Sequence, residues 1–471
     1  MSDLSGWHAH QVHRYTDGPT ACVAKPNVVK SIRREIERAG ALSTADVRLA
    51  SAMRLVRADT ARRVGLNDGL FYPPGHAREL AGARRAPLAA AALAPTPGVR
   101  KLHALALLVD FTDNAGTRPA ADFERLLFDQ TNPGSMASYY KAISGGQLDV
   151  SGEAVGYLRM PHPYAFYTNG ESGMGETTYP QNGPGLLFDA LTELCKNDSL
   201  ARFDTDSDGY VDGIFLIHAG GGAEAEPDPD KRKDMIWSHK WVLPAPFDDH
   251  GTKVYAYSTE PEDGRVGVFA HEFGHVLGLP DLYDTSYRSA GAGQWCLMAG
   301  GSWGGQGNQP TRMSCWCLSR LGWIAPRTVA KTAGKTFTLD TLANDPTACL
   351  RVWKRGASGA EYFLLENRQK AGQDSALPGN GLAVWHVDET QSGNTNPLAY
   401  LVGLVQADGR RDLELDANPG DAGDLFPGTA AVKRISDSTT PGLRANDGST
   451  TGIVASAIRE AAGVVSLRLK V

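Results

Sequence analysis

The chain has 471 residues, 42% of them hydrophobic and 21% charged, which is enough to bury substantial cores in two or three domains. Its formal net charge of -6 argues against a nucleic-acid-binding protein. No apolar run is long enough to span a bilayer, so we expect a globular protein without a membrane span, and we expect it to be a monomer.

Residues 1–98 have the pattern of a prosegment followed by a linker. Residues 1–20 contain several charged and histidine side chains and no apolar core, which argues against a Sec signal peptide. Residues 26–65 are charged and follow a helical pattern, whereas the Pro/Ala-rich stretch 86–98 is typical of a linker. This N-terminal region therefore looks separate from the part of the chain that follows.

The cysteines leave two questions open. Cys22, in the sequence ACVAKPN, could cap a zinc ion in a latent form because thiolates are good zinc ligands; a buried cysteine without that role is the simpler alternative. Cys315 and Cys317 are too close in sequence to bridge each other, although either could reach Cys296. The even count of six permits disulfides without requiring them.

From residue 99 onward the pattern becomes that of a mixed domain. An apolar strand is predicted at 105–111, a helix at 132–143, an alternating strand at 147–157 and a short strand at 214–218. Strands and helices therefore alternate in this part of the chain. We place this domain at 99–325 and assign the whole chain to the α+β class.

An acidic loop in this domain predicts a calcium site. Residues 204–212 present oxygen ligands at alternate positions around a glycine, which is how proteins wrap calcium. The position at which an EF-hand carries its bidentate Glu is occupied by Phe215, so the loop is not an EF-hand. The alternative is a solvated acidic turn. The expected ligands are the side chains of Asp204, Asp206, Asp208 and Asp212 and the carbonyl of Tyr210.

The most informative segment is His271-Glu272-Phe273-Gly274-His275. Residues four apart on a helix lie one above the other, so His271 and His275 can bind one zinc ion while Glu272 serves as general base. Zinc takes imidazole and carboxylate ligands and lowers the pKa of water from about 15.7 to roughly 7. Apolar neighbours throughout the segment predict a buried helix rather than a chance match on a solvated one.

A third zinc ligand is needed, and two candidates follow the helix. Gly278 is placed to end the helix in a left-handed turn, and in longer motifs of this kind the third ligand comes three residues later, here Asp281. Asp284 is the competitor, since Pro280 makes the turn hard to predict. Downstream, Met298 precedes a Gly/Ser-rich turn, as in the Met-turn of metzincin-like enzymes.

At this point the chain resembles a known family, the immune inhibitor A type metalloproteases of peptidase family M6. The segments that carry the resemblance are HEFGHVLGLPDLYD, LMAGGSW, LLENRQ, GLAVWHVDE, QADG and GDAGDLFPG. The resemblance implies a zinc endopeptidase made as a zymogen and usually secreted, with bound calcium and with protein or peptide substrates. It makes His271, His275 and Asp281 the zinc ligands and Glu272 the base. Cys296 departs from it, because an acidic residue is expected there.

After residue 325 the sequence predicts a β-rich, sandwich-like domain over 326–471. Strands are predicted at 336–339, 349–353, 361–366, 382–387 and 464–471, separated by Gly, Asn, Asp and Pro. His386, Asp388 and Glu389 could pass for a second metal site, but strand alternation sends Glu389 to the opposite face from the other two. We interpret all three as structural.

Two hypotheses of different classes remain. The first is a zinc endopeptidase that binds substrates in an extended conformation, by augmentation of an edge strand. The second is a calcium-dependent binding or structural protein with a vestigial zinc site. Glu272 favours the enzyme, because a dead homologue would be free to lose the base while keeping the ligands. A hydrolase of non-peptide amides is a third possibility.

Overall fold

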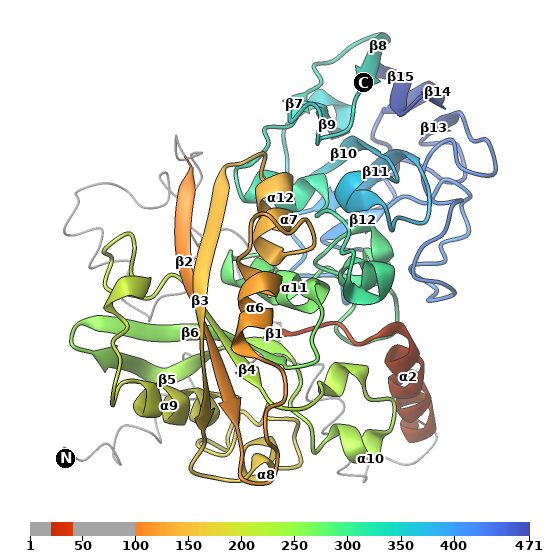
Figure 1. Cartoon of the computed structure of the whole chain (residues 1–471). Coiled ribbons are helices and arrows are strands. Elements are labelled where there is room, and N and C mark those ends of the chain that lie inside the picture. Colours follow the sequence, from red (N-terminus) through yellow and green to blue (C-terminus); the bar gives the residue numbers. More distant parts are fainter. Residues whose placement is uncertain (1–19, 41–98) are drawn as a thin grey trace. The chain divides into compact units, whose positions relative to one another are not determined.

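A computed structural model of the protein describes residues 20–40 and 99–471. Its contacts divide the chain into two compact units, which are described separately (Figure 1). The first unit ends at Gly278 and the second begins at Leu279, except that the short segment 142–146 belongs to the second. The predicted signal-free N-terminus, the later part of the helical pattern and the 86–98 linker lie outside the described residues.

The first unit is built on a six-stranded sheet with the order β1-β5-β6-β4-β2-β3. Strands β3, β2, β4 and β6 run parallel, whereas β5 is antiparallel to β6 and β1 is antiparallel to β5. The strands are β1 (Thr20–Ala21), β2 (Arg100–Asp110), β3 (Leu148–Arg159), β4 (Ile214–His218), β5 (His239–Asp249) and β6 (Thr252–Pro261). A strand of the predicted prosegment therefore forms one edge of this sheet.

Helices lie along this sheet and close its core. α6 packs on β3, α9 on β5, and α11 on β5 and β6 (Figure 1). The helices and 3-10 turns are α2 (Pro26–Gly40), α6 (Ala120–Leu127), α7 (Met136–Ile143), α8 (Tyr164–Thr168), α9 (Gly183–Leu194), η1 (Ala201–Phe203), η2 (Ala223–Ala225), α10 (Pro229–Arg232) and α11 (Val266–Val276). Apolar side chains of β2, β4 and α9, such as Leu107, Leu216 and Leu191, form one buried cluster.

The predicted elements of this unit are present, with shifted ends. The helix predicted from 132 begins at Met136, because Asn132 caps a turn by accepting from Gly134 N and the Ser135 hydroxyl accepts from Ser138 N. The strand predicted at 105–111 is the apolar half of β2, and β4 has its predicted bounds. Two elements were not predicted from the sequence: α9, whose first residues Gly183-Pro184-Gly185 resemble a turn, and β5, which contains two prolines.

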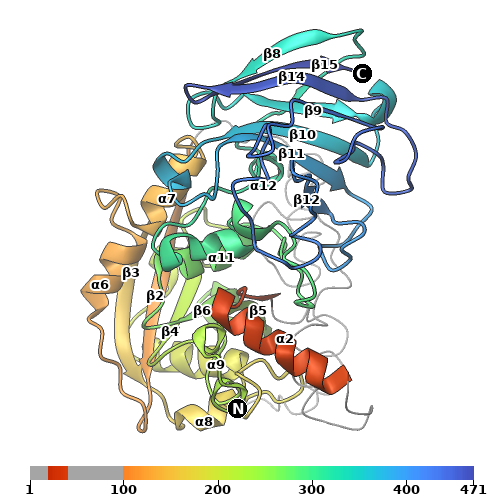
Figure 2. The ribbon, with the colours of Figure 1, turned by 90° about the vertical axis from the view of Figure 1, so that its right-hand side faces the viewer.

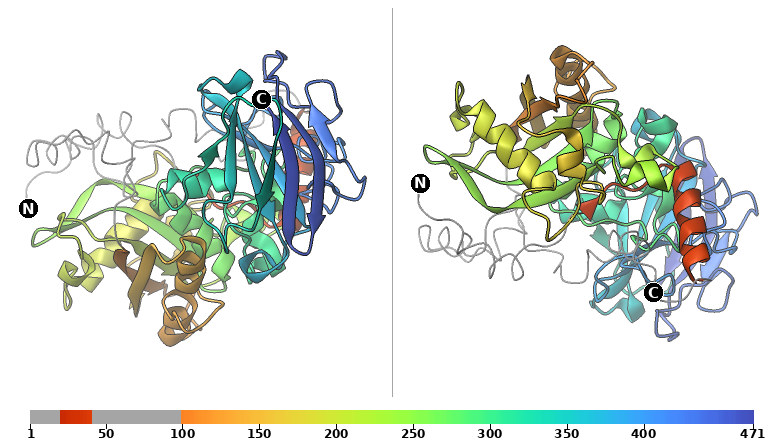
Figure 3. Two further views of the ribbon diagram at one scale, coloured as in Figure 1. Left: turned by 90° about the horizontal axis from the view of Figure 1, so that it is seen from above. Right: turned by 90° about the horizontal axis from the view of Figure 1, so that it is seen from below.

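The second unit contains two antiparallel-rich sheets. The first has the order β12-β11-β10-β9-β7 and the second β13-β14-β15-β8. Their strands are β7 (Arg327–Thr328), β8 (Lys335–Leu339), β9 (Cys349–Trp353), β10 (Glu361–Arg368), β11 (Gly381–Asp388), β12 (Val402–Leu404), β13 (Arg434–Ser436), β14 (Val454–Ala461) and β15 (Val464–Lys470). Figure 3 shows β14 and β15 as long neighbouring arrows beside the C-terminus. All five strands predicted from the sequence are found here.

One hydrophobic core joins the two sheets of the second unit. Val352 and Phe363 from the first sheet belong to the same buried cluster as Ile458 and Leu467 from the second, and Figure 2 shows the sheets lying over one another. The segment before them carries η3 (Gly293–Trp295), η4 (Gly300–Gly307) and α12 (Cys315–Arg320), and η5 (Lys354–Gly356) and η6 (Gly372–Asp374) follow. Alternation of buried and exposed positions along β15 explains why this strand was easy to predict.

Three general expectations can now be compared with the structure. The architecture is mixed α and β, as predicted for the class. Within residues 20–40 and 99–471, none of the helices has both the length and the apolar character needed to cross a bilayer. All six cysteines lie in the described part of the chain and none forms a disulfide; Cys317 does approach Cys296, with 3.9 Å between the two sulfur atoms.

Candidate metal centre

Helix α11 presents the two histidines of the motif to one point. The Nε2 atoms of His271 and His275 lie 3.2 Å apart, and their rings are nearly perpendicular. Every residue of α11 is buried, as the apolar neighbours of the motif predicted. The one-turn spacing of the pair, fixed by the helix, is therefore what brings two imidazole nitrogens together inside the protein.

Two aromatic side chains of the first unit hold this helix in place. The Tyr140 hydroxyl donates a hydrogen bond to the carbonyl of Ala270, 2.6 Å away, directly before the first histidine. The ring of Phe273, which lies between the two histidines in sequence, packs against Tyr140 and stacks on Phe215 of β4. The face of α11 that lies opposite the two histidines is therefore the face that contacts the sheet.

The segment after the helix supplies a carboxylate to the same point. Gly278 has φ +91°, the left-handed turn that the sequence predicted. Within this short stretch of chain, ligand atoms of His271, His275 and Asp281 all lie within 4.8 Å of one another. Asp284 does not join them, because its two carboxylate oxygens accept hydrogen bonds from Ser286 and Ser289.

This set of donors matches the chemistry of zinc. Two imidazoles and one carboxylate are the protein ligands of many catalytic zinc sites, which leave a further position open. All three side chains are at most 3% exposed, so they are shielded from water. Glu272 is fully buried as well and follows the first ligand in sequence.

The predicted Met-turn segment packs next to the chain that follows the helix. Met298 is fully buried, and its carbonyl accepts a hydrogen bond of 2.7 Å from Leu282 N, one residue after Asp281. Cys296, where the family resemblance leads one to expect an acidic residue, accepts a hydrogen bond from Ser314 N at 3.3 Å. Burial raises the pKa of this thiol, but hydrogen bonds from Cys317, Ser314 and Met298 outweigh burial, so the pKa is lowered overall. The position is thus built to accept hydrogen bonds, as a carboxylate would.

Cys22 lies beside the histidine helix. Its sulfur, a ligand nitrogen of His271 and a carboxylate oxygen of Glu272 lie within 4.8 Å of one another, and Cys22 is fully buried. The backbone there continues the sheet: Cys22 N donates to the carbonyl of Ser238, and the indole Nε1 of Trp237 donates to the carbonyl of Cys22, both at 2.8 Å. The N-terminal segment therefore enters this site as an edge strand.

Helix α2 anchors the same segment to the first unit. Arg232 Nη2 lies 2.6 Å from both carboxylate oxygens of Glu35, and the Ser31 hydroxyl donates to the carbonyl of Pro227. Val28 and Ile32 on this helix are buried, and Figure 1 places α2 beside α10. The sequence analysis did not identify this ion pair, because nothing in the sequence links two residues that are 197 positions apart.

The acidic loop brings three of its predicted ligands together. Carboxylate oxygens of Asp204, Asp206 and Asp208 lie within 4.8 Å of one another. Asp212 has another position, where its oxygens accept hydrogen bonds from Thr205 and from His103 N. Burial raises the pKa of Asp206, and the neighbouring carboxylates raise it further. Tyr210 follows in the loop, where its amide donates to Asp208.

Several titratable residues outside the metal centre, among them His386, Asp388 and Glu389, are held by structural contacts. His239 is buried between Trp237 O and the Tyr257 hydroxyl, and burial lowers its pKa to about 4. His386 pairs with Glu361 at 2.8 Å, whereas Glu389 accepts from Trp316 and Tyr362 and Asp388 accepts from Thr390, Gln391 and Asn446. The structural interpretation of this triplet is therefore consistent with its contacts. The ring of Tyr283 packs near that of Tyr287.

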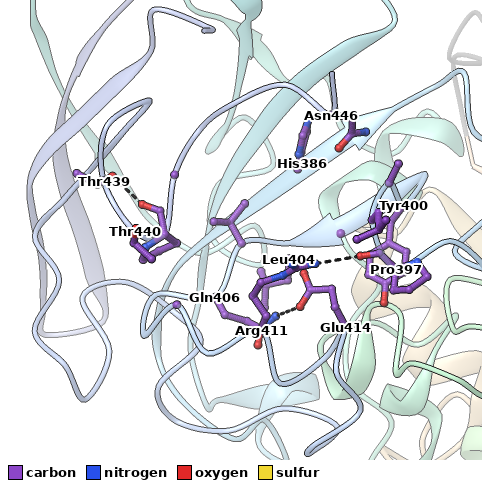
Figure 4. A pocket seen from close by; sticks show the side chains of 17 residues that line it. His386, Pro397, Tyr400, Leu404, Gln406, Arg411, Glu414, Thr439, Thr440 and Asn446 are labelled. Atoms are coloured by element: carbon purple, nitrogen blue, oxygen red, sulfur yellow. Dashed lines mark hydrogen bonds between the residues drawn. The ribbon is translucent and has the colours of Figure 1, made fainter. Parts of the chain in front are cut away.

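A separate pocket lies in the second unit. Figure 4 shows its side chains, with Gln406 donating to Glu414 and Arg411 donating to the carbonyl of Pro397. His386, Tyr400 and Asn446 also line it. These hydrogen bonds tie the lining residues to one another, and we assign the pocket no chemistry.

Comparisons with known proteins agree with the geometry of the metal centre. The family profile described as "Immune inhibitor A peptidase M6, catalytic domain" matches residues 121–321. Immune inhibitor A of Bacillus thuringiensis subsp. alesti is 34% identical over 268 residues, covering 46% of this chain and 39% of the relative. The pre-pro-metalloprotease PrtV of Vibrio cholerae serotype O1 is 32% identical over 271 residues, covering 46% of this chain and 29% of the relative.

The aligned region thus spans well under half the length of these curated relatives. The residues matched by the family profile, 121–321, include α11 with both histidines, Asp281 and the Met298 segment. The helix, its left-handed end and the matched profile therefore agree with one another: residues 121–321 of this chain are similar to the catalytic domain of the immune inhibitor A peptidases, family M6.

Proposed function

We propose that the protein is a zinc endopeptidase that hydrolyses peptide bonds of proteins. The observation that carries the proposal is the set of His271, His275 and Asp281 ligand atoms within 4.8 Å of one another, with Glu272 on the same buried helix. When bound, zinc would polarise the scissile carbonyl and acidify the attacking water. The hydrogen-bonded state of Asp284 supports Asp281 as the third ligand.

Glu272 would act as general base and then as general acid. Its carboxylate would take a proton from the attacking water and pass it to the leaving amine, so that one side chain serves both half-reactions. The position of Glu272 supports this role, because it directly follows the ligand His271 on the same buried helix. The ligands hold the reacting groups in place while Glu272 moves the proton.

We further propose that the N-terminal segment keeps the enzyme latent. β1 pairs with β5 at the edge of the sheet, which is where an extended substrate could bind by strand addition. Cys22 then lies next to His271 and Glu272, where a thiolate would be a zinc ligand and would keep the base from substrate. Removal of residues 1–98 would open both the edge strand and the metal centre.

The remaining parts of the proposal concern architecture and location. We propose a zincin-like catalytic domain at 99–325, a sandwich-like domain at 326–471 and an extracellular site of action, as the family resemblance implies. A structural calcium ion would be held by Asp204, Asp206 and Asp208, with Tyr210 and Asp212 completing the loop after a small rearrangement.

The catalytic proposal is tested with the protein cut within residues 86–98. Hydrolysis of casein is measured together with bound zinc for the wild type, the Glu272→Ala variant and a chelated sample. We expect cleavage in the wild type alone, with zinc retained in Glu272→Ala. Zinc binding without proteolysis under any activation would contradict the proposal and favour the binding protein or a non-peptide amide hydrolase.

Latency is tested separately on the uncut chain. In the cobalt-substituted protein, a thiolate ligand would give a charge-transfer absorption band, which we expect in the wild type and not in Cys22→Ala. The matched control is Cys195→Ala, a free cysteine elsewhere in the first unit, which should leave the band unchanged. A band that persists in Cys22→Ala would exclude this cysteine as the latency ligand, while leaving the catalytic proposal intact.

A further inference from the structure

A second group of carboxylates converges in the second unit, away from the residues used above. Oxygens of Asp408, Asp421 and Asp424 lie within 4.8 Å of one another. Two of these residues are partly buried and Asp424 is fully buried. Among the described residues, the ion pair recorded for the cluster is the one between Asp408 and Arg410, at 3.6 Å and with Arg410 68% exposed. Three acidic groups therefore meet beside a single, solvent-facing cation.

An unsatisfied oxygen points to a missing ligand. Asp424 Oδ2 accepts hydrogen bonds from Trp295 Nε1 at 2.9 Å and from Asp421 N at 3.0 Å. Asp424 Oδ1 is buried and has no hydrogen-bond partner within residues 20–40 and 99–471. A buried carboxylate oxygen left unpaired is costly, whereas a bound cation would satisfy it.

The local backbone leaves room for the carboxylates to approach. A Cβ atom at Gly423 would lie 2.7 Å from Asp408 Oδ2 and 2.9 Å from Asp421 Oδ1, closer than a side chain tolerates. Asn418 orients the cluster, since its side-chain amide donates to Asp421 Oδ2 and to Asp412. The lack of a side chain at Gly423 therefore leaves the space that the carboxylates of Asp408 and Asp421 occupy.

We propose that Asp408, Asp421 and Asp424 bind a calcium ion. Hard divalent cations prefer oxygen ligands, and calcium accepts the irregular, partly hydrated geometry that three carboxylates on one loop can offer, whereas magnesium demands a regular octahedron. The loop 408–424 supplies all three ligands.

The same ion would brace the Met-turn segment. Trp295 donates to Asp424, Gln294 N donates to the carbonyl of Pro419 at 2.7 Å, and Arg368 donates to the carbonyl of Trp295. Trp295 comes three residues before Met298. The ion would thus hold the 408–424 loop against η3, the turn that leads into the Met298 segment.

The proximity of an indole to the cluster provides a specific measurement. Terbium replaces calcium at carboxylate sites, and its luminescence is sensitised by a nearby tryptophan. The experiment uses the full chain with Glu272→Ala, to prevent self-cleavage, and with Asp206→Ala and Asp208→Ala, to remove the acidic loop of the first unit. We expect one terbium ion per chain, sensitised by tryptophan excitation and displaced by calcium but not by an equal concentration of magnesium.

Variants then assign the site. Asp421→Asn and Asp424→Asn should each weaken terbium binding at least tenfold, whereas Asp447→Asn, at an exposed site of the second unit, should leave it unchanged. Trp295→Phe should reduce the luminescence while the rise in melting temperature with calcium remains. If Asp421→Asn and Asp424→Asn do not fold, Asp408→Asn tests the site instead, because it leaves the hydrogen bond from Trp295 to Asp424 intact. Binding that survives all three Asp→Asn changes, or that magnesium displaces equally well, would overturn the proposal.

Discussion

Arg232 and Glu35 form an ion pair that joins α10 to α2 within the first unit: Arg232 Nη2 lies 2.6 Å from each carboxylate oxygen of Glu35. Arg232 is only 7% exposed and Glu35 21%, so water screens the pair weakly. The pair holds α2, which follows Cys22 in the chain, against α10. The ion pair of Arg232 and Glu35 therefore contributes to the free energy with which the proposed prosegment binds to the rest of the first unit.

The first prediction is that Arg232→Ala loosens this segment. Loss of Arg232 removes the ion-pair partner of the partly buried Glu35 carboxylate, which keeps its hydrogen bond from the Ser31 hydroxyl, and we expect this loss to cost about 2 kcal/mol of docking free energy. The uncut variant should be cleaved faster after residue 40 by a trace of added protease, with the rate followed by mass spectrometry. Lys231→Ala is the matched control, because Lys231 is 70% exposed and faces Asp228 at 4.0 Å. Equal cleavage rates in the two variants would contradict the prediction.

The second prediction concerns Cys296. Its sulfur accepts hydrogen bonds in a fully buried position, so Cys296→Val would leave Ser314 N without its acceptor. We expect the free energy of unfolding to fall by roughly 1–3 kcal/mol in the valine variant and by less in Cys296→Asp, which restores an acceptor. Denaturation by urea measures both, and a valine variant as stable as the wild type would show that the hydrogen bonds contribute little.

The third prediction concerns the acidic loop of the first unit. If Asp204, Asp206 and Asp208 hold calcium, the ion stabilises the folded protein by about 2.7 kcal/mol when its concentration is one hundred times the dissociation constant. Asp208→Ala should lower the calcium content by one ion per chain, measured by elemental analysis. A chelator should also lower the melting temperature of this variant by less than it lowers that of the wild type. Asp230→Ala, at an exposed site on α10, is the control. An unchanged calcium content would exclude the loop.

Much of the fold and of the metal centre followed from local patterns. Periodicity located β4 and β9 with their exact bounds, since both are short apolar runs between turn residues. The helix with His271 and His275 and the left-handed Gly278 follow from spacing within eleven residues of chain. Such features depend on neighbours in sequence, and local chemistry is sufficient to predict them.

Features that depend on distant parts of the chain were not predicted. β5 contains Pro244 and Pro246, which local rules exclude from a central strand, and the register shift between Val242 and Phe247 accommodates them. The approach of Cys22 to His271 requires the pairing of β1 with β5, which no local pattern encodes. The carboxylate cluster had a sequence signal, the acidic segments QADG and GDAGD, but their convergence is a tertiary property.

The last prediction concerns a buried acid in β6. Glu260 is fully buried, and burial raises its pKa well above the usual value, with the Glu224 carboxylate adding to the shift. The folded protein therefore keeps this proton at pH values where the unfolded chain, with a pKa of about 4.3, has lost it. Because the native state then binds more protons, stability falls as pH rises above that value, by up to about 1.4 kcal/mol per pH unit.

Glu260→Gln removes the titrating group and keeps the shape of the side chain. Urea denaturation from pH 5 to pH 8, on a Glu272→Ala background, should therefore show a smaller fall in the free energy of unfolding per pH unit than in the parent protein. Glu193→Gln, at a half-exposed site beside Lys196, should keep the parent slope. Parallel slopes for the Glu260→Gln variant and the parent would mean that Glu260 is ionised in the folded protein.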